Sequence, residues 1–201
     1  MKAINRFIVN CFCLLYPIKI IGKENLPEGG ALLASNHLSA LDCGYIAKLY
    51  GKDISFIAKK ELFKNKLIAK LIKSFGGLPI DRENPELKSI ISILKNLKED
   101  HKVVIFPEGT RNKNNPDVLG PFKSGTAVFA VKSKKPIVPI AILKKAKIFR
   151  KNYLYVGNPF ELSEYYDKKL TDEDTKNIDS IIYEQLSKTR LSLKESIKRK
   201  R

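Results

Sequence analysis

The chain has 201 residues, of which 29% are charged and 43% hydrophobic. A single domain of this length buries roughly two-thirds to three-quarters of its unfolded surface, and this composition excludes an intrinsically disordered protein. The formal net charge of +17 indicates anionic partners: nucleic acid, acidic lipid, phosphorylated substrates or an acidic carrier protein. Cys11, Cys13 and Cys43 form no CxxC pair and have no histidine at metal-ligand spacing. We therefore expect no disulfide framework, no metal site and a reducing, cytosolic setting.

The N-terminal segment, residues 1–17, is predicted to form a helix that lies in a membrane interface. Its apolar run, Phe7 to Tyr16, is about half as long as the roughly 20 residues that a spanning helix requires, and Pro17 closes it. It lacks a small-x-small cleavage site, so we do not expect a signal peptide. The apolar face has Ile4, Phe7, Ile8, Cys11 and Leu15, and the polar side has Lys2, Arg6 and Asn10. The alternative is a terminal helix packed on the domain core.

The remaining residues, 18–201, alternate between strand-like and helix-like patterns. Strands are predicted at 18–23, 31–35, 54–58, 78–80, 102–106, 137–143 and 153–156. Helices are predicted at 42–50, 61–75, 85–99, 125–132 and 172–198, the last with a Thr171 to Asp174 capping box. This order predicts an α/β domain with a largely parallel central sheet flanked by helices. Ligands of such domains bind beyond the carboxyl ends of the strands.

The first motif that carries chemistry follows the strand at 31–35. His37 and Asp42 are five residues apart, about 140° around a continuous helix, so they can meet only across a turn. The turn between strand and helix would let the Asp42 carboxylate hold one ring nitrogen while the other removes a proton from an alcohol. Alternatively, Ser39 and Asp42 form a capping box, and Asp42 is only a helix-start residue.

The second motif, Phe106 to Arg111, directly follows an apolar strand. Proline ends sheet pairing, and Gly109 allows the backbone to approach a ligand closely. Arg111 can grip a phosphate with two hydrogen bonds, and Thr110 adds a donor. Glu108 is expected to orient the loop through backbone N–H groups or to pair with a cation such as Arg82. The alternative is an ordinary tight turn with a surface Arg–Glu pair.

Read together, these motifs resemble the glycerolipid acyltransferase family over roughly Ile20 to Ile142. Asn36-His37 to Asp42 is similar to the family's NHxxxxD signature, and Phe106 to Arg111 is similar to its third block. The other similar segments, in order, are Phe56 to Phe63 with its lysine, Gly77 to Arg82, Phe122-Lys123-Ser124-Gly125, and Val138-Pro139-Ile140.

The resemblance implies that an acyl group moves from a thioester, either acyl-CoA or acyl carrier protein, to the sn-2 hydroxyl of 1-acyl-glycerol-3-phosphate. The product would be phosphatidic acid, and no cofactor or metal is implied. It assigns His37 as general base and Asp42 as its orienting partner. Lys59, Arg82 and Arg111 would bind the glycerol phosphate, with Glu108, Gly109 and Thr110 shaping the pocket. Acceptance of glycerol-3-phosphate or another lysophospholipid remains an alternative.

The C-terminal residues 188–201 contain seven basic residues and one acid, a net +6. Beside an anionic membrane surface this tail would be a second attachment signal. Alternatively, the same tail would attract acyl carrier protein or the phosphates of acyl-CoA. A third alternative is that the tail is only a solvated terminus. We expect peripheral or monotopic attachment at the cytoplasmic face of the cell membrane.

The remaining features of the sequence indicate no further site. Nucleic acid is not expected as a partner, because the chain shows no Cys/His finger, RNP-like motif or recognisable helix-turn-helix. Cys43 is interpreted as a small buried helix residue rather than a nucleophile, and His101 as a surface residue. The helix at 61–75 is interpreted as packing its apolar face on the protein while its basic face stays in solvent. Alternatively, part of that apolar face lines an acyl groove.

Overall fold

The computed structural model describes residues 3–50, 54–81, 84–112, 115, 117–123 and 125–199. Its helices are α1 (Ala3–Leu15), α2 (Asp42–Tyr50), α3 (Lys66–Ser74), α4 (Leu87–Lys98), α5 (Thr126–Ser133) and α6 (Asp172–Lys198). Its strands are β1 (Ile18–Ile21), β2 (Ala31–Ser35), β3 (Ile54–Lys59), β4 (Gly77–Ile80), β5 (Lys102–Ile105), β6 (Ile137–Ile142) and β7 (Asn152–Val156).

The strands of the described residues form one sheet in the order β1-β7-β6-β2-β5-β3-β4. The strands from β6 to β4 are mutually parallel, as predicted, so their carboxyl ends share one edge. The β7 strand runs antiparallel to β6, and β1 pairs with β7 in parallel. The opposite direction of β7 and β1, relative to the other strands, was not predicted, because the hydrophobic pattern of a strand does not reveal its direction.

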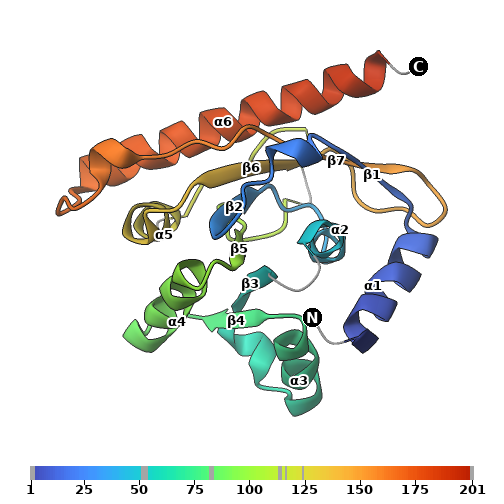
Figure 1. The fold of residues 1–201 in the computed structure, drawn as a ribbon, viewed down its shortest axis with the longest axis horizontal. Coiled ribbons are helices and arrows are strands. Elements are labelled where there is room, and N and C mark those ends of the chain that lie inside the picture. Colours follow the sequence, from blue (N-terminus) through green and yellow to red (C-terminus); the bar gives the residue numbers. More distant parts are fainter. Residues whose placement is uncertain are drawn as a thin grey trace.

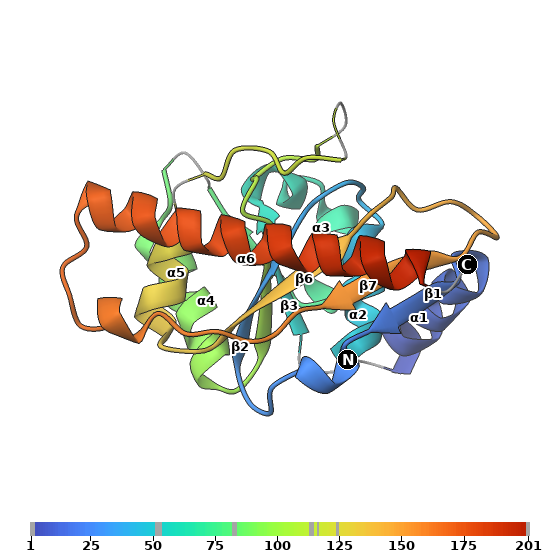
Figure 2. The same cartoon turned by 90° about the horizontal axis from the view of Figure 1, so that it is seen from above.

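Helices cover both faces of the sheet (Figures 1 and 2). Side chains from alternate positions of the central strands enter two separate cores, because successive residues of a strand point to opposite faces. One core joins α1 and α2 to the sheet and contains Val9, Leu33, Tyr45, Ile46, Val104 and Val138. The other joins α4, α5 and α6 to the sheet and contains Leu32, Ile93, Val103, Phe129, Ile137 and Ile178.

Most predicted elements lie within two residues of the observed ones, and the capping box at Thr171 and Asp174 is present. The predicted helix at 61–75 is wrong as a single element. It divides into a 3-10 turn (Lys60–Phe63) and α3, because the Asn65 side chain accepts the backbone N–H groups of Leu67 (3.0 Å) and Ile68 (3.2 Å) and starts a new helix there. Its apolar face is also not packed away, since Leu67 is 80% exposed.

The N-terminal helix packs one face on the domain core, as the alternative interpretation predicts, and exposes another face. Val9 and Asn5 are buried, and Phe12 packs on the core beside α2. Phe7 (67% exposed) and Leu14 (77% exposed) present an apolar surface to solvent instead. Lys2 and the side chains of Ile4 and Arg6 lie outside what the structure describes. The membrane role of this helix stays a prediction.

Candidate active site

The two chemical motifs lie at the same edge of the sheet. They follow β2 and β5, which are parallel neighbours with Ala34 paired to Ile105. Their loops therefore leave the sheet side by side. The third neighbour, β3, ends at Lys59 on the other side of β5. Sheet topology alone thus brings together a histidine, an arginine-containing loop and a lysine that are distant in the sequence.

Asn36 fixes the start of the histidine loop. Its side chain is buried and forms two hydrogen bonds with the backbone of Ile142, each of 2.8 Å: its amide donates to the carbonyl and its oxygen accepts the N–H. The His37 backbone continues this anchoring, since its carbonyl accepts the N–H of Asn112 (2.8 Å). These bonds fix the backbone from which the imidazole projects.

The His37–Asp42 pair has the geometry of an oriented base. Nδ1 of His37 lies 3.0 Å from Oδ2 of Asp42, which also accepts the backbone N–H groups of Leu38 and Ser39, both at 2.7 Å. Asp42 is fully buried, and the His37 side chain is 16% exposed. The hydrogen bond assigns the proton to Nδ1 and leaves Nε2 as the basic atom.

The turn predicted for this motif is therefore present, and the capping interpretation is also correct in part. Asp42 is the first residue of α2, and its carboxylate accepts the backbone N–H of Ser39, three residues before it. One carboxylate oxygen satisfies the N–H groups of the turn and holds the imidazole at once. These two roles do not compete.

Glu108 joins the second motif to the first. It is buried, its Oε1 accepts the backbone N–H of His37 (2.9 Å), and its Oε2 accepts the N–H of Gly120 (2.8 Å). The first of the two alternatives, orientation through backbone N–H groups, is confirmed. Arg82, the cation of the other alternative, lies outside the described residues. Glu108 is therefore a positioning residue at the centre of the site.

An aromatic residue completes the wall behind the imidazole. The Phe106 ring stacks on His37, with ring centroids 4.0 Å apart and an interplanar angle of 21°. It restricts rotation of the imidazole and excludes water from one of its faces. Phe106 was predicted to end a strand and begin the second motif, without a contact to the imidazole. Its position in the second motif was the available signal.

A pocket of about 1350 Å³ opens in front of His37. Its polar side includes the exposed residues Lys59, Thr110 and Arg111 and the buried Gly109, so the structure places these four predicted residues around one cavity. Gly109 has φ +66°, a conformation that suits glycine. Lys59 also forms an ion pair with Glu61 (3.4 Å).

Lys123 is a pocket residue that was not predicted as a site residue. It is exposed, and a Cβ added to Gly109 would lie 2.7 Å from its Cδ, so its stem runs beside the loop of the second motif. The sequence signal that could have identified Lys123 was its position in the Phe122-Lys123-Ser124-Gly125 run. Ser124 lies outside the described residues.

The rest of the pocket is apolar. Three helices contribute to this apolar wall. The residues are Ile8, Val9 and Phe12 of α1; Ala40, Leu41, Gly44 and Ala47 of α2 and the turn before it; and Leu71, Ile72 and Phe75 of α3 and its end. The interpretation that part of the 61–75 apolar face lines a groove is thereby supported. One cavity thus contains a base, a cationic rim and an apolar wall.

Comparison with known proteins decides the family. A sequence model of the family described as Acyltransferase matches residues 17–143, more than half of the chain. The chain belongs to this acyltransferase family.

Curated relatives include proteins named 1-acyl-sn-glycerol-3-phosphate acyltransferase in Bacillus subtilis and Helicobacter pylori. The first is 36% identical, with 74% of this chain and 76% of the relative covered. The second is 35% identical, with coverage of 72% and 62%. The crystal structure of a 1-acyl-sn-glycerophosphate acyltransferase from Thermotoga maritima has the same fold, with a TM-score of 0.64 at 21% identity. The structural match covers 94% of this chain and 83% of the Thermotoga maritima chain.

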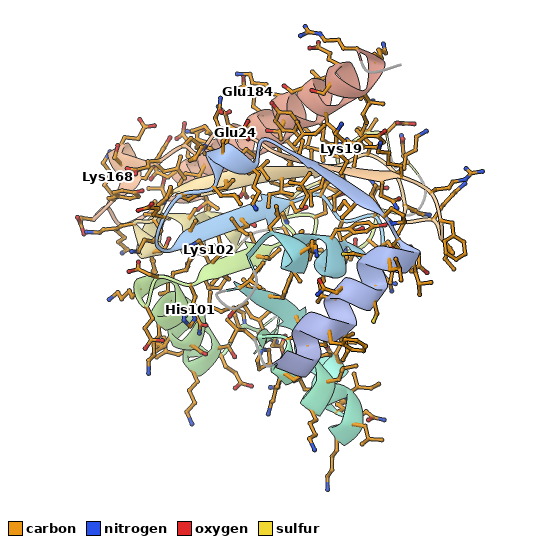
Figure 3. The ribbon with its side chains drawn as sticks, turned by 45° about the vertical axis from the view of Figure 1, so that its right-hand side comes forward. Lys19, Glu24, His101, Lys102, Lys168 and Glu184 are labelled. Carbon is orange, nitrogen blue, oxygen red and sulfur yellow. The ribbon has the colours of Figure 1, made fainter. Side chains whose placement is uncertain are left out.

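The structure also places two other reactive side chains, Cys43 and His101. Burial, followed by the nearby charge of Asp42, raises the pKa of the Cys43 thiol to about 12, which keeps it protonated. His101 is half-buried rather than on the surface, because its ring pairs with Asn96 (3.2 Å); Figure 3 shows it beside α4. Neither position changes the assignment of His37.

Within the described ranges, no group of three or more His, Cys, Asp or Glu side chains is placed to hold a metal ion. Across those same ranges, no helix combines the length and the apolar character needed to cross a membrane.

Proposed function

We propose that this acyltransferase moves a fatty acyl group from a thioester, acyl-CoA or acyl carrier protein, to the sn-2 hydroxyl of 1-acyl-glycerol-3-phosphate. The product is phosphatidic acid, a precursor in phospholipid biosynthesis. One observation carries the proposal: the His37–Asp42 pair lies between a cationic rim and an apolar wall of one pocket. The names of the curated relatives support the same acceptor.

His37 acts as general base and then as general acid. Its Nε2 takes the proton of the acceptor hydroxyl as the oxygen attacks the thioester carbonyl. The buried Asp42 carboxylate, 3.0 Å from Nδ1, stabilises the imidazolium. When the tetrahedral intermediate collapses, the carbon–sulfur bond breaks and the imidazolium returns the proton to the departing thiolate. A thioester is already activated, so no acyl-enzyme and no cofactor are required.

The cationic rim binds the acceptor phosphate. Arg111 provides a planar fork that matches two phosphate oxygens, and Lys59 and Lys123 add positive charge. Arg82 keeps its predicted role in phosphate binding, on the strength of the family resemblance. Glu108, Gly109 and Thr110 shape the loop. The apolar wall between α1, α2 and α3 accommodates acyl chains.

We infer peripheral attachment to the cytoplasmic face of the cell membrane. The outer face of α1 exposes Phe7 and Leu14, and the final turns of α6 are basic. Lysophosphatidate is a membrane lipid, and α1 also lines the pocket. Attachment through α1 would therefore place the pocket close to its acceptor.

Purified protein tested with a panel of acceptors provides the direct test. Lysophosphatidate, glycerol-3-phosphate and neutral lysolipids are offered in vesicles, with acyl-CoA and acyl carrier protein thioesters in parallel, and products are identified by mass. We expect phosphatidic acid from lysophosphatidate, and none from protein carrying His37→Ala. Transfer only to another acceptor would overturn the substrate assignment. No transfer, together with tight and salt-sensitive nucleic-acid binding, would overturn the proposed function.

A further inference from the structure

The hairpin that connects β6 to β7, residues 143–151, combines positive charge with exposed apolar side chains. Its sequence Leu-Lys-Lys-Ala-Lys-Ile-Phe-Arg-Lys has five basic residues and no acid. At its tip Ile148 is 54% exposed and Phe149 is 76% exposed. The basic residues are exposed on both sides of this pair. Nothing in the proposed mechanism uses this segment.

The backbone of the hairpin is fixed beside the end of α1. The N–H of Phe149 donates to the carbonyl of Leu15 (2.8 Å), and the N–H of Asn152 donates to the carbonyl of Pro17 (2.8 Å). Phe149 has φ 54°, a left-handed conformation that is unfavourable for a bulky residue. The fold thus holds an exposed aromatic residue in a strained position next to Leu14 and Leu15, which are also exposed.

Two segments that are distant in the sequence meet at this end of the molecule. Figures 1 and 2 both place the β6–β7 hairpin beside the end of α1, at the right-hand side of each view, whereas α6 packs on the opposite face of the sheet. Figure 3 turns this end toward the reader. The exposed apolar residues of α1 and the hairpin therefore belong to one surface.

We propose that the β6–β7 hairpin is a membrane-docking loop that inserts Ile148 and Phe149 into an anionic lipid surface beside α1. An apolar tip between cations matches the boundary between acyl chains and anionic headgroups. A second copy of the chain is the wrong partner, since a symmetric contact would bring two sets of five cations together. This inference deepens the proposed membrane attachment and rests on it.

A single-tryptophan variant measures insertion directly. The chain contains no tryptophan, so Phe149→Trp introduces the only one. Its matched control is Leu87→Trp on α4, where the native side chain is 70% exposed. With phosphatidylglycerol-containing vesicles we expect a blue-shifted emission and quenching by brominated lipid for Phe149→Trp, and neither for Leu87→Trp. Unchanged emission from Phe149→Trp would overturn the proposal.

Paired serine substitutions measure the contribution to binding. For I148S/F149S we expect a loss of roughly tenfold or more in the vesicle partition coefficient, because each side chain contributes through the apolar area that it buries. L87S/I91S on α4, with native exposures of 70% and 54%, should bind like the unmodified protein. An equal loss in both variants, or none in I148S/F149S, would contradict a specific docking loop.

Charge and activity measurements separate this inference from the proposed function. K147Q/R150Q should weaken binding to anionic vesicles and flatten its salt dependence, while binding to neutral vesicles stays the same. I148S/F149S should keep its transfer rate with a short-chain, water-soluble lysophosphatidate and lose it with vesicle-borne acceptor. His37→Ala should show the reverse, with intact vesicle binding and no transfer. If I148S/F149S instead lost binding to acyl carrier protein but not to vesicles, a protein-docking role would replace the proposal.

Discussion

The two sides of the pocket differ in how firmly they are held before any substrate arrives. At the base side, Asp42 is fully buried and one of its oxygens contacts His37, Leu38 and Ser39. At the rim, Lys59 and Arg111 are exposed, and Lys59 shares an ion pair with Glu61. In the proposed mechanism, chemistry therefore depends on a fixed group, whereas anion recognition depends on long side chains that must be ordered on binding. Changes at the base side should lower kcat, and changes at the rim should raise KM.

His37→Ala has the largest expected effect. It removes the group that carries the proton in both halves of the reaction, so kcat should fall by about 10³-fold or more. Binding of lysophosphatidate, measured by equilibrium methods, should change little, and the circular dichroism spectrum should be unchanged. Full activity in this variant would refute the assignment of the base.

Asp42→Asn tests whether the firm hold on the imidazole matters for chemistry. The amide oxygen can still accept the N–H groups of Leu38 and Ser39, but it cannot stabilise an imidazolium as a carboxylate does. We expect kcat to fall by roughly 10²- to 10³-fold with KM within about threefold. If kcat and KM changed together, Asp42 would act mainly as the helix-start residue.

Glu108→Gln tests the link between the two sides. An amide cannot accept from both the His37 and Gly120 N–H groups through its two ends, so one buried donor loses its partner. Such a donor costs about 1–3 kcal/mol, and we expect a lower Tm and a kcat reduced by about tenfold. Glu184→Gln on α6, whose exposed position Figure 3 shows, is the matched control and should change neither.

The sequence predicted the residues on both sides of the pocket better than it predicted the contacts between them. The spacing of His37 and Asp42, with the strand before and the helix after them, was sufficient to require a turn. The direction of β7, the stacking of Phe106 on His37 and the stem of Lys123 beside Gly109 depend on contacts between distant segments. Local periodicity carries no information about such contacts. The break at Asn65 was readable as a capping residue, but the apolar spacing on both sides concealed it.

Arg111→Lys tests the rim. Lysine keeps the charge but loses the planar fork, so KM for the phosphorylated acceptor should rise by about tenfold with kcat within about threefold. A water-soluble, short-chain lysophosphatidate removes any contribution of membrane binding to this measurement. Arg150→Lys, outside the pocket, is the control. Unchanged acceptor kinetics would remove Arg111 from phosphate contact.

Cys43→Ala should have the smallest effect on transfer, although Cys43 lines the pocket and follows Asp42 in the sequence. With a thiol pKa of about 12, the thiolate fraction at pH 8 is on the order of 10⁻⁴, too small for a nucleophile. Because the pKa is raised, alkylation of Cys43 by iodoacetamide should keep accelerating as the pH rises from 8 to 11, measured by mass spectrometry of the labelled peptide. Cys11 is exposed and should be labelled first. Transfer activity within about twofold of the unmodified protein would exclude Cys43 as a nucleophile. A loss comparable to that of His37→Ala, together with an acylated Cys43 peptide detected by mass spectrometry, would instead favour a covalent intermediate on Cys43.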